Sequence, residues 1–373
     1  MQEIKKRRIA IASILKPVDD TRMFEKLAQS LVQSGFYEVH VLGYPTKLDS
    51  SFPNIHLHAS KNFKRLSVRR IIQPFIVLKK LLQLKPQSLI VSTHELLFVA
   101  VIFKLITGCR IYYDVQENYY RNIRYTNVFP AWLKLPLAWF VRFKEIISSP
   151  FITTFILAET GYAKELSFVQ QKFIVLENKF KKPGDLSSNR IKTGDFIHLL
   201  FSGTLDEATG VFNAIELVKN LHTINHHVRL TLIGYCSKPS TYLRIKQEIN
   251  DCNFIKLKGG NELVPHTEII KEIQKADAGI IAYSITKITE SRVPTKLFEY
   301  LGCGLHILLP NHKLWTDRCP ENTSLSIDFK NPDINTINRY LSSLKSFDPA
   351  LCDVFWKDEA TRLINLLETN STS

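Results

Sequence analysis

Two charged side chains stand out in the segment VPTKLFEYLGCGLHILL, residues 293–309. A proline and a glycine pair bound a short helix there, and the apolar run after it is typical of a buried strand. Lys296 in the first turn opposes the helix dipole, which costs about 0.3–1 kcal/mol of helix stability. Glu299, as its i, i+3 partner, recovers only about 0.2–0.5 kcal/mol. Because helix stability does not explain the pair, we expect Lys296 to face an anion and Glu299 to accept hydrogen bonds from a ligand.

Other polar residues of the second half follow predicted strands. The strand FIHLLFSG ends at Gly203, and the next turn carries Thr204 and Thr209 around a helix predicted to start near Ala208, with Gly210 in its first turn. Backbone N–H groups of such a turn can cradle a phosphate, although an ordinary strand-to-helix turn has the same pattern. The other candidates on this rim lie at strand ends or in the loops after them: Gly234, His266, Tyr283, Glu290, Arg292, Pro294 and Thr295. A capping or satisfied histidine is the more common finding at such a position, and this is the alternative for His266.

Candidate residues of the first half also follow predicted strands. Asp114 and Glu117 follow RIYYDV, where a carboxylate could orient or deprotonate an acceptor hydroxyl. A structural alternative has Asp114 capping the loop and Glu117 solvated. Arg22, after the first strand, could meet an acceptor or a phosphate, and His94 ends the strand SLIVST, where a core or capping role fits as well.

Apolar runs that alternate with amphipathic segments must position these residues. The first-half strands are RIAIASI, YEVHVLG, SLIVST, RIYYDV, FITTFILA and KFIVLEN; the later ones are FIHLLFSG, HVRLTLIG, NFIKLKG, AGIIAYS, LHILL and SLSID. Helical patterns lie between them, such as DTRMFEKLAQSLVQSG, which opens on an Asp/Thr cap and closes on Gly35. The alternation predicts an α/β protein with parallel sheets covered on both faces. The turn-rich segment KKPGDLSSNRIKTGD indicates a linker between Rossmann-like domains at residues 1–185 and 195–350, with a ligand between them.

Charge is distributed unevenly along the 373 residues. Residues 1–190 contain 29 Lys/Arg and 14 Asp/Glu, a net +15, and the remaining residues contain 20 and 21, a net −1, which sum to +14. A basic half indicates an anionic partner, and a membrane surface fits better than nucleic acid because the basic clusters lack interleaved aromatic platforms. A merely solvated basic face is the alternative. The six scattered cysteines indicate a reducing compartment without zinc or disulfides, and we expect a cytoplasmic protein, peripheral on the inner face of a membrane.

The aromatic segment NVFPAWLKLPLAWFVRFKEII mixes tryptophan and phenylalanine with lysine and arginine. An amphipathic helix of this composition suits a membrane interface beside a lipid-linked acceptor, whereas packing into its own domain is the simpler interpretation. Motifs of other enzyme classes are missing, because the sequence has no strand followed by GxGxxG, no P-loop and no GxSxG.

The block PTKLFEYLGCGLHILL, with ADAGIIAY and FSGTLDEATGVFNAIEL before it, resembles the nucleotide-sugar half of GT-B glycosyltransferases of the family 4 type. Four further segments match the same family in the same order along the chain: KPVDDTRMFEKLAQSL, IYYDVQENYY, FILAETGYAKEL and VLENKF. The segment DVFWKDEATRLINLLE, within residues 351–373, resembles the helix with which such enzymes cross back onto the first domain. The resemblance implies two Rossmann-like domains and transfer of a hexose from a nucleotide sugar to a glycan or lipid-linked glycan in polysaccharide biosynthesis. It further implies retention of configuration, no metal and no cofactor, and a Glu299 that binds the donor ribose.

Two departures from this family pattern leave alternatives open. A second glutamate of the family falls on Ser291, next to Glu290, and the usual arginine and lysine for the diphosphate fall on Thr204 and Thr209. The diphosphate would then need backbone amides and another base, for which Lys296, Arg292 and Lys287 are the candidates. A nucleotide-sugar epimerase or hydrolase of the same fold, or a non-catalytic GT-B-like module, are the rival functions.

Overall fold

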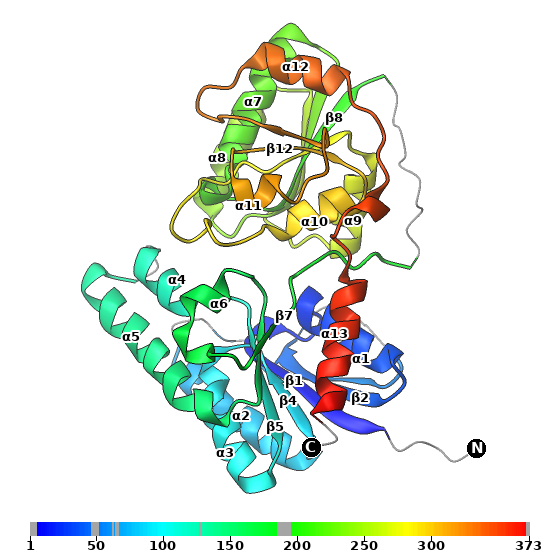
Figure 1. Cartoon of the computed structure of the whole chain (residues 1–373). Coiled ribbons are helices and arrows are strands. Elements are labelled where there is room, and N and C mark those ends of the chain that lie inside the picture. The colour runs from blue at the N-terminus through cyan, green and yellow to red at the C-terminus, as the bar shows by residue number, and fades with distance from the viewer. Residues whose placement is uncertain are drawn as a thin grey trace. The chain divides into compact units, whose positions relative to one another are not determined.

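The computed structural model describes residues 6–45, 52–61, 63, 67–126, 129–184 and 195–370, and the chain divides into two compact units (Figure 1). Unit 1 comprises residues 1–181 and 356–373, and unit 2 comprises residues 182–355. Most of the predicted linker falls on residues 185–194, outside the described residues. None of the described helices is both long and apolar enough to cross a membrane.

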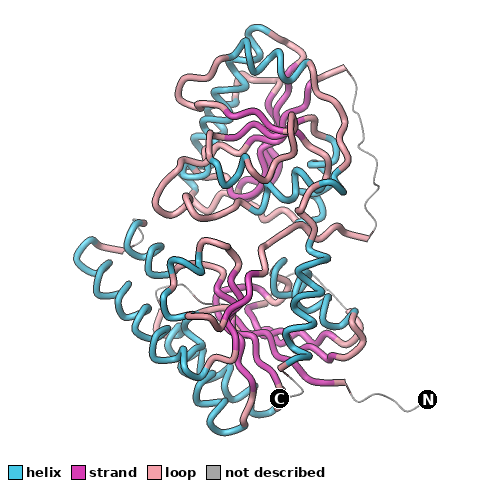
Figure 2. The backbone as a smooth tube through the Cα atoms, in the orientation of Figure 1, coloured by secondary structure: helices cyan, strands magenta, loops and turns pink. Residues whose placement is uncertain are grey.

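Unit 1 is built on a seven-stranded parallel sheet, visible as the lower group of strands in Figure 2. The strand order is β3-β2-β1-β4-β5-β6-β7. The strands are β1 (Arg7–Pro17), β2 (Tyr37–Tyr44), β3 (Ile55–Ala59), β4 (Ser88–Val91), β5 (Arg110–Val115), β6 (Thr154–Leu157) and β7 (Phe173–Val175). All six predicted strands of this half are present, whereas β3 was not predicted. The sheet order reverses between β1 and β4, the place where parallel sheets open a crevice at their carboxyl ends.

Helices cover both faces of the unit 1 sheet, as the alternation predicts. They are η1 (Thr21–Ala28, a π-helix), α1 (Gln29–Gln33), α2 (Arg69–Leu84), η2 (His94–Leu96), α3 (Leu97–Thr107), α4 (Tyr119–Tyr125), α5 (Ala131–Ser148), η3 (Ser149–Phe151), α6 (Tyr162–Glu165), η4 (Ser167–Val169) and α13 (Trp356–Thr369). Ile9 and Ile11 of β1 join the core under η1, α1 and α13, and the alternate residues Ala10 and Ala12 join the core under α2 and α3. The period-two pattern thus assigns each side of β1 to its own helical layer.

Unit 2 repeats this architecture with a six-stranded parallel sheet in the order β10-β9-β8-β11-β12-β13. Its strands are β8 (Ile197–Thr204), β9 (Val228–Tyr235), β10 (Ile255–Gly260), β11 (Ala278–Ile280), β12 (His306–Leu309) and β13 (Ser324–Ser326). Its helices are η5 (Glu207–Thr209), α7 (Val211–Ile224), α8 (Pro239–Ile249), α9 (His266–Lys275), α10 (Thr295–Gly302), α11 (Lys313–Thr316), α12 (Ile334–Ser342) and η6 (Pro349–Leu351). The order reverses between β8 and β11, so the loops after these strands flank the crevice of this sheet.

Candidate functional site

The carboxyl ends of β8 and β9 in unit 2 are held together by glycines. Gly234 has φ +147°, and a Cβ there would lie 1.7 Å from the carbonyl oxygen of Gly203. Gly203 has φ +93°, and its own Cβ position lies 3.9 Å from Cε of Lys296. The two strand ends therefore approach as closely as glycine backbone permits, and Lys296 of α10 lies directly beside the end of β8.

Lys296 is a buried cation in the first turn of α10. Its side chain is 5% exposed, and in the described part of the chain its Nζ has no hydrogen-bond partner. The ammonium lies over two aromatic rings, 4.3 Å from the centroid of Phe201 and 5.0 Å from that of Tyr283. Burial lowers the pKa of Lys296 to about 7, and the nearby charge of Glu299 opposes the shift. An unpaired buried ammonium costs several kcal/mol, so an anion beside it would be strongly favoured.

Glu299 lies one turn further along α10 and is held by a histidine from α9. Nε2 of His266 is 2.9 Å from Oε1 of Glu299, and both side chains are about four-fifths buried, at 21% and 17% exposure. Burial, together with the charge of Glu299, raises the pKa of Tyr283 to about 12. One carboxylate oxygen is thus engaged and oriented, and a carboxylate retains further lone pairs for ligand hydroxyls. His266 is the first residue of its helix, and its ring contacts the carboxylate.

The loop after β8 differs in detail from the prediction. Oγ1 of Thr209 lies 2.8 Å from the carbonyl oxygen of Thr204 and 3.2 Å from the N–H of Asp206, so this side chain closes the loop. The helix α7 begins at Val211, not near Ala208, and Gly210 is its N-cap with φ +81°. A Cβ at Gly210 would lie 2.0 Å from the carbonyl oxygen of Ala282, which explains why glycine stands between η5 and α7.

The segment between β11 and α10 ends in a proline directly before the first residue of α10. Pro294 is the N-cap, Thr295 is exposed at the first position, and no side-chain hydrogen bond caps this helix. The carbonyl of Arg292 accepts a 2.6 Å hydrogen bond from Nε1 of Trp315, which holds the end of the loop, and Glu290 is exposed. Contacts join six of the predicted residues: Gly203, Gly234, His266, Tyr283, Lys296 and Glu299. Thr204 and Arg292 lie next to this group, and for Glu290 only its place in the loop before α10 is established. Phe201 was not predicted, although strand alternation places it on the side of Gly203.

In unit 1, Arg22 and Asp114 form a buried ion pair. Arg22 is 2% exposed and Asp114 is fully buried; Nε of Arg22 is 3.0 Å from both carboxylate oxygens, and its Nη2 is 2.7 Å from Oδ1. The same guanidinium donates to the carbonyl of Leu176 and lies 5.9 Å from the ring of Trp356. Asp114 is therefore shielded from solvent in this structure, and its geometry matches a structural role. The pair connects β5, η1 and α13 across the sheet edge.

Glu117, the other carboxylate proposed for the acceptor side, is exposed. It accepts a 2.7 Å hydrogen bond from Nδ2 of Asn122 in the next helix. Between the two carboxylates, Gln116 donates to Asp114 over 2.5 Å and accepts from Lys16. A catalytic function of either carboxylate stays a prediction, and only Glu117 is open to solvent.

His94 lies in a buried polar row after β4. Its Nδ1 is 3.0 Å from Nζ of Lys144 and its Nε2 is 3.3 Å from Oε1 of Glu95, which also pairs with Arg70. Burial lowers the pKa of His94 to about 4, so its ring is neutral near pH 7. The ammonium of Lys144 donates to Nδ1 of His94, and the protonated Nε2 of His94 faces the carboxylate of Glu95. These contacts fit a core role for His94. Among the described residues, no three His, Cys, Asp or Glu side chains form a cluster that could hold a metal.

Comparison with known proteins gives a clear result for the fold. No protein-family model and no curated protein matches the sequence. Sucrose-phosphate synthase from Thermosynechococcus elongatus is similar in structure, with a TM-score of 0.65, 13% identity and coverage of 96% of this chain and 94% of that one. Anabaena HepE with UDP and glucose follows at TM-score 0.64, 11% identity and 99% and 100% coverage.

A third similar structure, from Listeria monocytogenes, has a provisional assignment as UDP-N-acetylglucosamine 2-epimerase. It matches at TM-score 0.63 and 12% identity over 99% of this chain and 97% of that one. The similar structures include glycosyltransferases of the GT-B type. The predicted GT-B fold with two Rossmann-like domains is therefore confirmed, and at these identities the likeness establishes the fold alone.

Proposed function

We propose that this protein is a glycosyltransferase that moves a hexose from a nucleotide sugar to a hydroxyl of a glycan or lipid-linked glycan, with retention and without a metal. The observation that carries the proposal is the ammonium of Lys296. It is buried at the end of β8, and within the described ranges no hydrogen bond satisfies it. Because a buried charge without a partner is costly, such a group fits a site that an anionic ligand completes.

The donor would bind through α10 and the strand ends around it. A diphosphate at the first turn of α10 would meet the ammonium of Lys296 and the positive end of the helix dipole together. Oε2 of Glu299 would accept ribose hydroxyls while His266 holds Oε1. As the sugar departs, the negative charge that develops on the diphosphate would be stabilised by the same groups, which are already in position.

The loop of Thr204 and Thr209 supports a larger share for Lys296 than the family pattern implies. Thr209 is engaged in closing its own loop and brings no charge to the rim. Arg292 and Lys287 lie in the segment before α10 and are the other candidate cations for the diphosphate. HepE was solved with UDP and with UDP-glucose, which supports a nucleotide-sugar donor for a chain of this fold.

Nucleotide binding tests the proposal directly. We expect UDP, GDP or ADP to raise the melting temperature of the protein, and Glu299→Ala to abolish most of that rise because the ribose contact is lost. Glu248→Ala is the matched control, since Glu248 forms a surface ion pair with Lys219 in the same unit and its removal leaves the rim untouched. The proposal fails if none of the nucleotides stabilises the protein, or if Glu299→Ala responds as the control does.

An epimerase is the second candidate, favoured by the similarity to the Listeria structure. The same nucleotide half would serve both reactions, so nucleotide binding does not separate them. Incubation of a nucleotide-sugar panel without acceptor does: an epimerase accumulates an altered nucleotide sugar, whereas a transferase turns over only when an acceptor is added. A non-catalytic module would bind nucleotide and turn over no donor in either assay.

A further inference from the structure

Three helices of unit 1 expose large apolar side chains along stripes of helical period. On α5 these are Trp132, Leu135, Trp139, Phe140, Phe143, Ile146 and Ile147; on α3 they are Phe98, Leu105 and Ile106; on α2 they are Ile71, Ile72, Phe75, Ile76 and Leu82, with Val68 just before the helix. Exposure reaches 77% for Trp132 and 71% for Ile71. Soluble monomers rarely expose contiguous apolar patches beyond a few hundred Å².

These stripes are separate from the faces that pack into the core. Val77 and Leu81 of α2, Phe103 of α3 and Val141 of α5 are buried on the opposite sides. The helix α3 contacts both α2 and α5, so the three helices form one layer, seen along the lower left of unit 1 in Figure 1. We call the exposed side chains of this layer the apolar face. Each helix thus has one apolar stripe for the core and a second that none of the described residues of unit 1 covers.

The charges around the apolar face have one sign. The three helices carry Arg69, Arg70, Lys79, Lys80, Lys104, Lys134, Arg142 and Lys144. Their one acidic residue, Glu145, is 2% exposed, lies 3.2 Å from Arg142 and accepts from the hydroxyl of Tyr113. No carboxylate of α2, α3 or α5 therefore reaches solvent. Apolar and cationic side chains without exposed acids match the composition of helices that bind anionic membrane surfaces.

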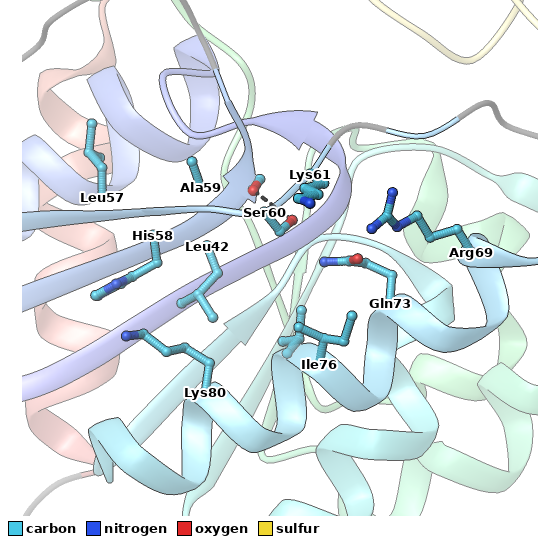
Figure 3. Close-up of a pocket in the computed structure, with 12 residues that line it drawn as sticks. Leu42, Leu57, His58, Ala59, Ser60, Lys61, Arg69, Gln73, Ile76 and Lys80 are labelled. Atoms are coloured by element: carbon cyan, nitrogen blue, oxygen red, sulfur yellow. Dashed lines mark hydrogen bonds between the residues drawn. The ribbon is translucent and has the colours of Figure 1, made fainter.

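A pocket with polar side chains at both of its ends opens beside α2. It has a volume of about 540 Å³ and lies between α2 and the ends of β2 and β3. Lys61, Arg69, Gln73 and Ser60 gather at one end, and His58 and Lys80 at the other (Figure 3). Gln73 is 1% exposed, and its Nε2 finds no hydrogen-bond acceptor in the described ranges. At the first end, two cations, Lys61 and Arg69, and the unsatisfied buried N–H donor of Gln73 suit a phosphate group. Ile76 belongs to both the pocket and the apolar face.

We propose that the apolar face of α2, α3 and α5 docks on an anionic lipid bilayer, with the pocket beside α2 receiving a lipid headgroup phosphate. The exposed aromatic side chains would enter the boundary between headgroups and acyl chains, where tryptophan is favoured. Basic residues near an anionic surface each strengthen binding about fivefold at low salt. A second copy of the chain fits the face poorly, because self-association would bring cations against cations. The inference does not depend on the proposed sugar transfer.

Vesicle binding by the full chain tests this docking. We expect the wild type to co-sediment with vesicles of phosphatidylglycerol and phosphatidylcholine in equal amounts, weakly with phosphatidylcholine alone, and less as salt rises. Trp132→Ser/Phe143→Ser/Ile147→Ser should weaken binding at least about tenfold, because each side chain contributes buried apolar area. The matched control is Leu243→Ser/Leu263→Ser/Leu351→Ser, which removes three comparably exposed apolar residues from unit 2. All substituted residues are at least half exposed, and circular dichroism confirms folding.

A charge-reversal variant and its control complete the experiment. Lys79→Glu/Lys80→Glu should weaken binding to the anionic vesicles by more than about 25-fold, since two favourable charges become unfavourable. Lys256→Glu/Lys313→Glu in unit 2 is its control. The proposal is overturned if the wild type binds neither vesicle or both equally, or if face and control variants behave alike. It is also overturned if light scattering finds a wild-type dimer that the face variant dissociates. Binding of glycerol phosphate in solution without vesicle binding would assign the pocket to a free phosphate and overturn the docking.

Discussion

The buried ammonium of Lys296 predicts an unusual response of stability to pH. Its pKa is about 7 in the folded chain against 10.5 for an ordinary lysine. The unfolded chain binds more protons between these values, so the folding penalty is fully present below pH 7 and disappears as pH rises towards 10.5. From the two pKa values the penalty is about 4 kcal/mol at pH 7 and about 1 kcal/mol at pH 9.5.

Lys296→Met removes this penalty while keeping the length of the side chain against Phe201 and Tyr283. We expect the variant to be more stable than the wild type at pH 7, and its advantage to shrink by about 3 kcal/mol at pH 9.5. For a unit of this size that change corresponds to about 6–12 °C in melting temperature. Scanning calorimetry of both proteins at the two pH values measures it, with Lys256→Met, an exposed lysine of β10, as the control.

The same lysine links pH to donor binding. Binding of an anionic diphosphate favours the protonated form of Lys296, so the affinity for a nucleotide sugar should fall about tenfold for each pH unit above 7. Lys296→Met should lose both this affinity and its dependence on pH. A Lys296→Met variant that is less stable than the wild type at pH 7 would contradict this prediction, as would a stability difference that is the same at pH 9.5. Either result would mean that the protein itself stabilises the charged form.

Two further predictions concern how the strand ends and the sheet of unit 1 are held together. Gly234→Ala should destabilise the protein by more than about 3 kcal/mol in chemical denaturation, because its Cβ would meet the carbonyl oxygen of Gly203. The control is Gly35→Ala, at φ +83° in open space, which should cost only about 1–2 kcal/mol. Asp114→Asn should lower the free energy of unfolding by about 3–5 kcal/mol, because it leaves the Arg22 guanidinium buried and unpaired. The double variant Arg22→Met/Asp114→Leu should recover part of this loss. An Asp114→Asn variant of unchanged stability that loses transfer activity would instead support the catalytic interpretation.

Hydrophobic periodicity was enough to predict most of the sheet. Every strand with a run of buried apolar residues was predicted, because a strand buried on both faces reads as a continuous apolar run. The missed strand β3, IHLHA, lies at the sheet edge and alternates apolar residues with histidine. A short edge strand with one polar face carries little of that signal, so its pairing with β2 could be seen only in the tertiary structure.

Local sequence also placed Gly203, Lys296 and Glu299 at one edge of the sheet, since parallel strands deliver their following loops to one edge, and the structure has them there. It did not predict that Lys296 is enclosed between Phe201 and Tyr283, or that Thr209 closes its own loop. Burial of a side chain depends on what packs against it from distant segments, and no local pattern records those partners.

The sequence alone therefore determined the class of fold, the alternation of strands and helices, and the positions of Lys296 and Glu299 at the start of a short helix. The tertiary structure decided what each charge meets. It buried Asp114 against Arg22, left Lys296 without a hydrogen-bond partner among the described residues, and turned the aromatic stripe of α5 outward. Periodicity along the chain indicates which face of a helix is apolar, but a helix with two apolar stripes can bury only one, and packing against its own sheet selects that one.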